Sequence, residues 1–157
     1  MNRQFGIALA MVAIAWTASA NAQSDLIDAT DPGGMRDIIR QLGYRALLET
    51  DEYGDPRIAT SVGGTTVYIY FYDCTDNADC RTIMYAGRYD PADNLTAEAM
   101  NDWNRDELFG RAYIDEDGYA WIELPVNTDG GISRANFEST FARWENIVAQ
   151  FESEMGL

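Results

Sequence analysis

The sequence predicts one α+β domain built on an antiparallel sheet, with its elements in the order α-β-β-β-β-α-β-β-α. Apolar residues alternate with polar ones in the predicted strands and recur at helical spacing in the predicted helices. Turn sequences rich in Gly, Asn and Asp join neighbouring strands, as they do in β-hairpins. No repeat or low-complexity linker interrupts this pattern, so we expect a single domain.

Residues 1–22 are predicted to be a signal peptide. Arg3 supplies a positive charge, and residues 5–16 are almost entirely apolar. Small residues follow as far as Ala22, which places the signal-peptidase cut between Ala22 and Gln23. The apolar run is shorter than the ~20 residues of a membrane-spanning helix. We therefore expect a bacterial protein that is periplasmic or secreted, with no membrane span after cleavage.

After the signal peptide we expect a short acidic leader over residues 23–30 and then the domain over residues 31–157. Each predicted helix begins at a residue whose side chain can cap the first turn, namely Asp31, Thr96 or Ser133. The third helix has the longest apolar stripe, formed by Phe137, Phe141, Trp144, Val148 and Phe151.

Strand-like segments fill the intervals between the helices. Before the second helix they cover residues 44–50, 57–62, 65–72 and 81–89; after it they cover residues 109–115 and 119–126. Asp117 and Gly118 are a strong hairpin signal between the last two. Pro125 predicts that the last strand ends there or lies at a sheet edge.

Cys74 and Cys80 stand at the two ends of the loop that joins the third and fourth strands, and we predict a disulfide between them. If the cysteines face each other, the register of the hairpin follows by symmetry about Asn77. It pairs Tyr72 with Thr82, Tyr70 with Met84, Tyr68 with Ala86, Phe71 with Ile83, Ile69 with Tyr85, and Val67 with Gly87. A redox or metal-binding pair is the alternative, but the spacing is not that of a CxxC motif.

The composition restricts the chemistry that the chain can perform. It has 26 Asp and Glu against 11 Lys and Arg, and this negative charge disfavours nucleic acids and anionic membranes as partners. It has no His, and all its basic residues are Arg, so His-dependent triads, His-ligated metals and lysine chemistry are excluded. We therefore predict no catalytic residue, no metal and no cofactor, and interpret the acidic loops as turns rather than calcium sites.

One face of the predicted hairpin is a candidate binding surface. Tyr68, Tyr70, Tyr72 and Met84 alternate onto this face, and tyrosine and methionine are typical of adaptable contact surfaces. We add Trp103 of the second helix to these possible partner-binding residues. The partner would be a protein or peptide, or a second copy in a homodimer. The same residues are also ordinary for a half-buried strand, and this interpretation stays open.

Several motifs resemble the YbjN domain family over about residues 31–153. They are FYDC…DC in the hairpin, Asn101-Asp102-Trp103-Asn104 in the second helix, FGRAYIDEDG, and Gly130-Gly131 before an aromatic-striped helix. The resemblance implies regulators of bacterial sensory transduction with a fold similar to type III secretion chaperones, which present a sheet and helices to protein clients. It implies no catalytic residues and no cofactor. The predicted signal peptide departs from the cytoplasmic members of that family.

We therefore expect an exported, non-enzymatic binding or regulatory domain that recognises a protein or peptide in the periplasm. One alternative is a carboxylate-dependent hydrolase of envelope polysaccharide, for which Glu123 beside Trp121 is the best candidate acid. Another is a purely structural envelope stress protein.

Overall fold

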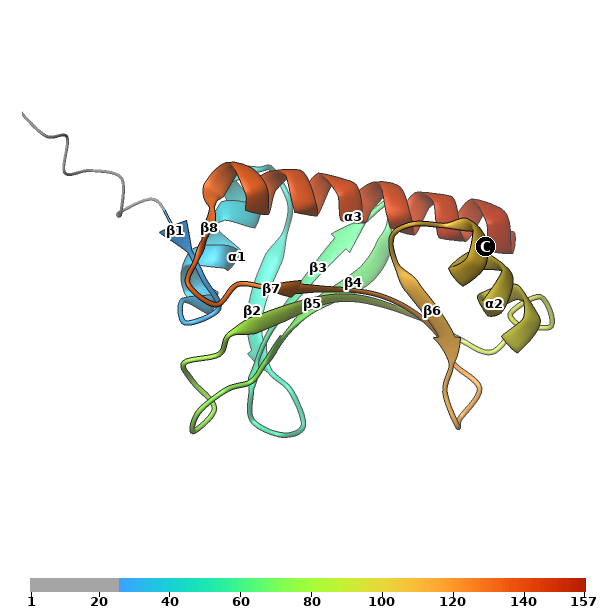
Figure 1. The fold of residues 1–157 in the computed structure, drawn as a ribbon, viewed down its shortest axis with the longest axis horizontal. Helices are drawn as coiled ribbons and strands as arrows, with labels where there is room; N and C mark the ends of the chain where they lie inside the picture. Colours follow the sequence, from blue (N-terminus) through green and yellow to red (C-terminus); the bar gives the residue numbers. More distant parts are fainter. Residues whose placement is uncertain (1–25) are drawn as a thin grey trace, which may run out of the picture.

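A computed structural model describes residues 26–157 of the protein (Figure 1). The predicted signal peptide, its cleavage site between Ala22 and Gln23, and the first residues of the leader lie outside the described residues. Within residues 26–157, no helix is long and apolar enough to cross a membrane.

An antiparallel sheet of six strands forms the centre of the domain, in the order β2-β3-β4-β5-β7-β6. The strands are β2 Ala46–Thr50, β3 Pro56–Val62, β4 Thr65–Tyr72, β5 Thr82–Tyr89, β6 Arg111–Ile114 and β7 Ala120–Asn127. After β5 the chain passes through a helix to the edge strand β6, and then returns as β7 between β6 and β5. The predicted α+β class and antiparallel sheet are confirmed.

Three helices accompany the sheet: α1 Pro32–Gln41, α2 Ala97–Asp106 and α3 Arg134–Met155. Figure 1 shows α3 lying along one face of the sheet, with α1 beside its first half and α2 at the far end near β6. The predicted caps are confirmed, because Asp31, Thr96 and Ser133 each accept a hydrogen bond from a backbone N–H of the first turn. Among residues 26–157, no helix lies on the opposite face of the sheet.

The aromatic stripe of α3 forms the centre of the core. Phe137, Phe141, Trp144 and Phe151 are all buried, and burying each such side chain contributes roughly 1.5–3 kcal/mol of hydrophobic free energy. The apolar residues of β4 and β5 that face α3 are buried as well; these are Val67, Ile69, Phe71 and Ile83.

Two carboxylates of α3 bond to hydroxyls of β4, β5 and the segment between α1 and β2. Glu152 accepts hydrogen bonds from the hydroxyls of Thr65 (2.5 Å) and Tyr89 (3.1 Å), and Glu145 accepts one from Tyr44 (2.5 Å). These glutamates are seven residues apart, two turns of the helix, and therefore lie on the same side of α3. They orient a helix whose hydrophobic contacts alone would be less directional.

The β4–β5 hairpin has the predicted register in full. Tyr70 lies opposite Met84, Phe71 opposite Ile83, and the other four predicted pairs also match. Cys74 and Cys80 form the predicted disulfide at the foot of the loop, and the part of the chain that the structure describes has no free cysteine. Several loop residues adopt positive φ, namely Asp73, Asp76, Asn77 and Asp79. Asp and Asn tolerate this conformation better than most residues, which explains the composition of the loop.

Two short strands were missed by the sequence prediction. β1 Leu26–Ile27 pairs with β8 Ile132–Ser133 in a separate two-stranded sheet. Ala29 is fully buried, and its backbone N–H donates to the hydroxyl of the buried Thr128 (3.2 Å). The second half of the expected acidic leader is therefore part of the folded domain, which corrects the predicted boundary at residue 31.

Pro125 lies in a locally exposed stretch of an otherwise internal strand. It pairs with Met84 of β5, but β6 reaches only as far as the pair Arg111–Glu123. Beyond that pair β7 has one neighbour, so the missing N–H of proline costs no ladder bond on the β6 side. The prediction of an edge position is correct locally, although β7 continues to Asn127.

The disulfide closes a short loop, and its removal should lower stability modestly. In the chain-entropy account, Cys74→Ala/Cys80→Ala lowers the free energy of unfolding by about 2 kcal/mol, because the unfolded chain gains freedom. Urea denaturation of the oxidised protein measures this difference. Reducing agent should destabilise the unaltered protein by a similar amount and leave the double variant unchanged; equal stability of all four samples would contradict the prediction.

Candidate functional site: the open face of the sheet

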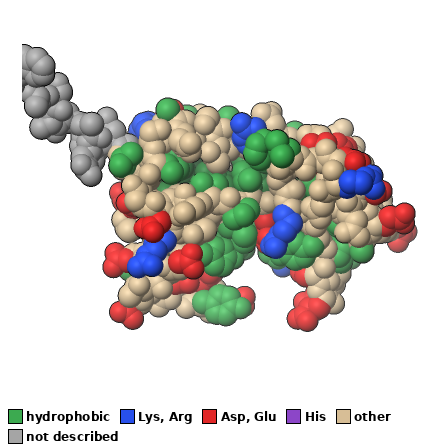
Figure 2. Space-filling model, in the orientation of Figure 1, with side chains coloured by type: hydrophobic (Ala, Val, Ile, Leu, Met, Phe, Trp, Pro, Cys, Tyr) green, Lys and Arg blue, Asp and Glu red, His purple; other side chains and the backbone are tan. Residues whose placement is uncertain are grey.

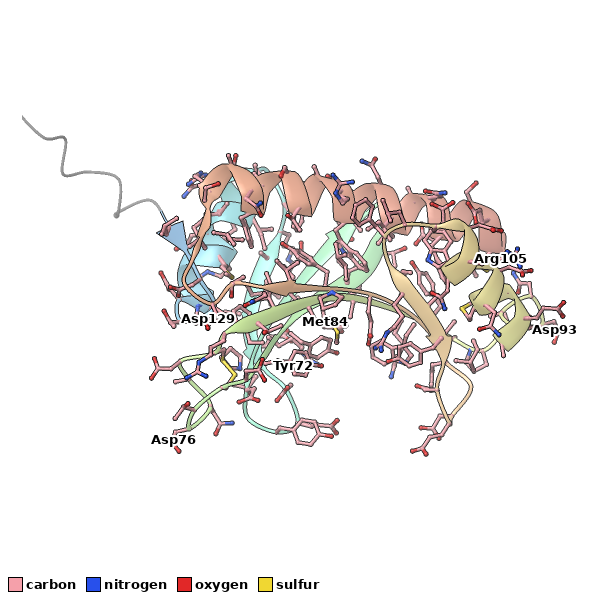
Figure 3. All side chains as sticks on the ribbon, viewed as in Figure 1. Tyr72, Asp76, Met84, Asp93, Arg105 and Asp129 are labelled. Carbon is pink, nitrogen blue, oxygen red and sulfur yellow. A yellow bond between two sulfur atoms is a disulfide. The ribbon has the colours of Figure 1, made fainter. Side chains whose placement is uncertain are left out.

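The face of the sheet opposite α3 is rich in aromatic residues, and no other element of the described part of the chain covers it. We call it the open face. It is formed by Arg57, Tyr68, Tyr70, Tyr72, Met84, Arg88, Tyr113, Trp121 and Glu123. Figure 3 shows Tyr72 and Met84 on the side of the sheet away from α3. Tyr72 is 43% exposed, and Tyr68, Tyr70 and Met84 are partly buried. The structure thus brings four of the five predicted contact residues together on one accessible surface.

The open face contains a hollow of about 440 Å³. Its floor is made by side chains of β3, β4, β5 and β7, and one wall is the β2–β3 loop with Asp51, Glu52, Tyr53 and Asp55. Figure 2 shows this side of the molecule recessed between two projecting lobes. Figure 1 shows the corresponding hairpin loops extending downward from an arched sheet. A cavity of this size can hold several side chains of a peptide or a small molecule.

Arginine side chains lie on the aromatic rings of this face. The Arg57 guanidinium carbon is 4.6 Å from the ring centre of Tyr68. That of Arg88 is 5.9 Å from the ring centre of Trp121 and 4.3 Å from that of Tyr119, which precedes β7. Arg57 is also bonded to Glu49 at 2.9 Å, which fixes its direction. Stacked guanidinium groups hold the rings in defined orientations and leave a mixed aromatic and charged floor.

Glu123 of β7 lies in the floor of the hollow and is only 3% exposed. One carboxylate oxygen accepts from the Arg111 guanidinium, and the other accepts from the Tyr113 hydroxyl at 2.8 Å. Burial, and then this bond to the negative carboxylate, raise the pKa of Tyr113 above its ordinary value. Glu123 therefore orients two neighbouring side chains, and both of its oxygens are occupied by them.

Negative charge also reaches the exposed edge of the hollow. Burial raises the pKa of Tyr72, and the charges of Glu123 and Asp51 raise it further. At the other end of the face, the Trp121 indole N–H donates to Asp115 at 2.8 Å. This bond, with backbone N–H groups of the β6–β7 turn, holds the pKa of Asp115 below its ordinary value. The hollow is thus lined by the carboxylates of Asp51, Glu52, Asp55 and Glu123 together with the guanidinium groups of Arg57 and Arg88.

Arg57, Arg88 and Tyr113 of the open face were not predicted as site residues. Symmetry about Asp117 would have placed Tyr113 opposite Trp121, as the structure does. Their rings are stacked, with an angle of 6° between the planes. The two arginines gave no such signal, because an exposed arginine on a strand is common.

Trp103 is buried, which corrects its prediction as a partner-binding residue. It is 2% exposed, packs edge-on against Phe151 of α3, and donates its indole N–H to the Gly110 carbonyl at 2.8 Å. Its neighbour Asn104 bonds both backbone groups of Ala112, donating to the carbonyl and accepting from the N–H, each at 2.8 Å. The Trp-Asn pair therefore attaches α2 to the outer edge of β6.

Residues 26–157 contain no group of three or more His, Cys, Asp or Glu side chains arranged to hold a metal ion. Asp51 and Asp115, whose loops border the open face, use their carboxylates to bond backbone N–H groups of their own turns.

A family model described as "Putative bacterial sensory transduction regulator" matches residues 31–157. The chain belongs to the YbjN family. Among solved structures it is similar to YbjN from E. coli, with 17% identity and a TM-score of 0.53 over 83% of this chain and 88% of that one. The Yersinia pestis type III secretion chaperone SycH, solved with a fragment of YscM2, aligns with 16% identity and a TM-score of 0.42, over 73% and 96% of the two chains. No curated protein matches the sequence.

Asn104 should contribute to stability well beyond what its position on a short helix suggests. Asn104→Ala leaves the N–H and carbonyl of the buried Ala112 without their partner, and we expect a loss of about 1–3 kcal/mol in the free energy of unfolding. Asn101→Ala is the matched control, because Asn101 is exposed on the same helix. Chemical denaturation of both variants tests this, and equal stabilities would refute the role of Asn104.

Proposed function

We propose that the protein is an exported, non-enzymatic domain that binds an extended segment of a protein or peptide partner on its open face. The observation that carries this proposal is the hollow beside Tyr70, Tyr72 and Met84, which no element of residues 26–157 covers. Aromatic rings supply contact area at little entropic cost, methionine supplies an adaptable apolar contact, and stacked arginines supply hydrogen-bond donors.

Charge favours a partner segment with basic side chains. The wall of the hollow includes the carboxylates of Asp51, Glu52 and Asp55, and the negative charge of the whole chain attracts cationic partners over a longer range. An arginine or lysine of the partner would meet tyrosine rings on one side and carboxylates on the other.

The arrangement of Glu123 favours binding over hydrolysis. A glycosidase needs a carboxylate that can deliver a proton to the substrate and a second one across the scissile bond. Both oxygens of Glu123 are instead bonded to side chains of β6. We therefore assign Glu123 an organising role in the binding surface.

Export is the first part of the proposal that can be tested. In a bacterial host, we expect the protein in the osmotic-shock fraction with Gln23 as its first residue, since the small residues before it suit signal peptidase. Intact-mass measurement determines the cleavage site, and thiol labelling reports whether Cys74 and Cys80 are oxidised. Full-length, reduced protein in the cytoplasm would contradict export.

Binding can be tested by selecting peptides from a random display library with the purified domain. We expect the enriched peptides to share basic and apolar positions. The double variant Tyr70→Ala/Met84→Ala should bind synthetic copies of these peptides at least about tenfold more weakly, as is common when central contact residues are lost. Calorimetry measures the affinities, and circular dichroism verifies folding.

Leu108→Ala/Phe109→Ala is the matched control for this experiment. It removes an exposed aliphatic and an exposed aromatic side chain that border α3 rather than the open face. Peptides that bind both double variants equally well, or a selection with no shared sequence, would overturn the assignment of the open face.

A further inference from the structure

We propose that β2 is a dimer interface, at which two copies of the chain pair antiparallel about Leu47. The inference starts from a contrast between the two edges of the sheet. At β6, α2 covers the edge and Asn104 bonds both backbone groups of Ala112. At β2, the one side-chain bond to the strand backbone within residues 26–157 comes from Arg40, which donates to the Ala46 carbonyl at 2.9 Å. An edge left open in this way is a template for another strand.

The side chains of β2 are unusually apolar for a free edge. Leu47 is 42% exposed and Leu48 41% exposed, on opposite faces of the strand, and Leu42 at the end of α1 is also exposed. Proteins commonly place charged residues or proline on edge strands to prevent pairing. The exposed leucines of β2 instead add hydrophobic contacts to any strand that pairs with it.

The backbone of β2 determines which residues can bond to a new strand. Asp51 donates its N–H to Asp55, so the odd-numbered residues of β2 bond to β3. Consistent with this alternation, Thr50 lies opposite Pro56, which has no N–H to donate. The Ala46 carbonyl is reached by Arg40 from the outside. The backbone groups of Ala46, Leu48 and Thr50 therefore point away from the sheet.

The two copies can pair only in registers that place outward-pointing residues of one copy opposite outward-pointing residues of the other. In one of these registers the opposing side chains are also complementary. With the two-fold axis at Leu47, Ala46 bonds to Leu48 of the second copy, and Leu47 faces Leu47 as a close non-hydrogen-bonded pair. Arg45 then lies opposite Glu49 of the second copy, and symmetry repeats this pair. Moving the axis to Leu48 places Leu47 opposite a carboxylate, which is less favourable.

Existing contacts at the edge are compatible with this arrangement. Glu49 already bonds Arg57 on the open face, and its second oxygen can accept from Arg45 of the other copy. The Ala46 carbonyl can likewise accept a second bond beside Arg40. The five-residue strand makes a small interface, so we expect a dimer that depends on concentration. This dimer would have one continuous sheet with the open faces of both copies on the same side. The proposal does not depend on what the open face binds.

Cysteine cross-linking tests the register. At a non-hydrogen-bonded pair the Cα atoms are ~4.5 Å apart, within the range that a disulfide spans. We expect Leu47→Cys to form a disulfide-linked dimer on mild oxidation, seen on a non-reducing gel. Leu48→Cys tests the neighbouring register, and Leu108→Cys, a highly exposed leucine elsewhere, is the control. Cross-linking of Leu47→Cys no faster than Leu108→Cys would overturn the proposal.

Charge exchange and mass measurement test the dimer without an added thiol. Light scattering of the unaltered protein should show mass rising toward that of a dimer as concentration increases. Arg45→Glu should abolish this rise by placing carboxylates opposite each other, and Arg45→Glu/Glu49→Arg should restore it. A monomer at every concentration, or a dimer unaffected by Arg45→Glu, would refute pairing through β2 and leave the edge to a strand of another protein.

Discussion

The packing of α3 against one face of the sheet is the interaction on which the rest of the structure depends. Its aromatic stripe fills the space between helix and sheet, and Glu145 and Glu152 bond to hydroxyls from the sheet side. The helix is long enough to cover much of one face, and α1 extends the same layer. Within residues 26–157 all the covering helices therefore lie on one side of the sheet, and the opposite side is left accessible.

Contacts within the domain hold the side chains of the open face in defined orientations. Glu123 holds Arg111 and Tyr113, Asp115 holds Trp121, and the stacked arginines restrict the tyrosine rings. A surface with few free rotamers loses little entropy on binding, which favours affinity for a segment that fits it. The buried carboxylate of Glu123 requires a hydrogen-bond partner on each oxygen. Replacing Glu123 would leave the Arg111 guanidinium and the Tyr113 hydroxyl without this partner.

The motifs that mark the family serve mainly to build this scaffold. Trp103 and Asn104 close the β6 edge of the sheet by bonding backbone groups, and the Gly130-Gly131 turn leads into β8 and α3. A Cβ on Gly131 would approach the Leu26 side chain to 2.8 Å, and its φ of +85° also suits glycine. Such residues identify the fold, whereas the residues that would meet a partner come from the alternating positions of β3, β4, β5 and β7.

The sequence by itself determined the order of the long elements, the helix caps and the register of the β4–β5 hairpin. These are local properties: periodicity and capping involve neighbours in the chain, and the disulfide made the register of Tyr70 and Met84 a matter of symmetry. The two-residue strands β1 and β8 are too short to have a period, so they could not be recognised.

Only the tertiary structure decided which aromatic residues are exposed. Trp103 and Tyr70 look alike in a sequence, because an amphipathic aromatic suits both a core and a contact surface. The position of α3 buries the first and leaves the second accessible. Arg57, Arg88 and Glu123 likewise come from three different strands. The strand order β3-β4-β5-β7 brings them to one surface, and the alternation of residues along a single strand does not specify that order.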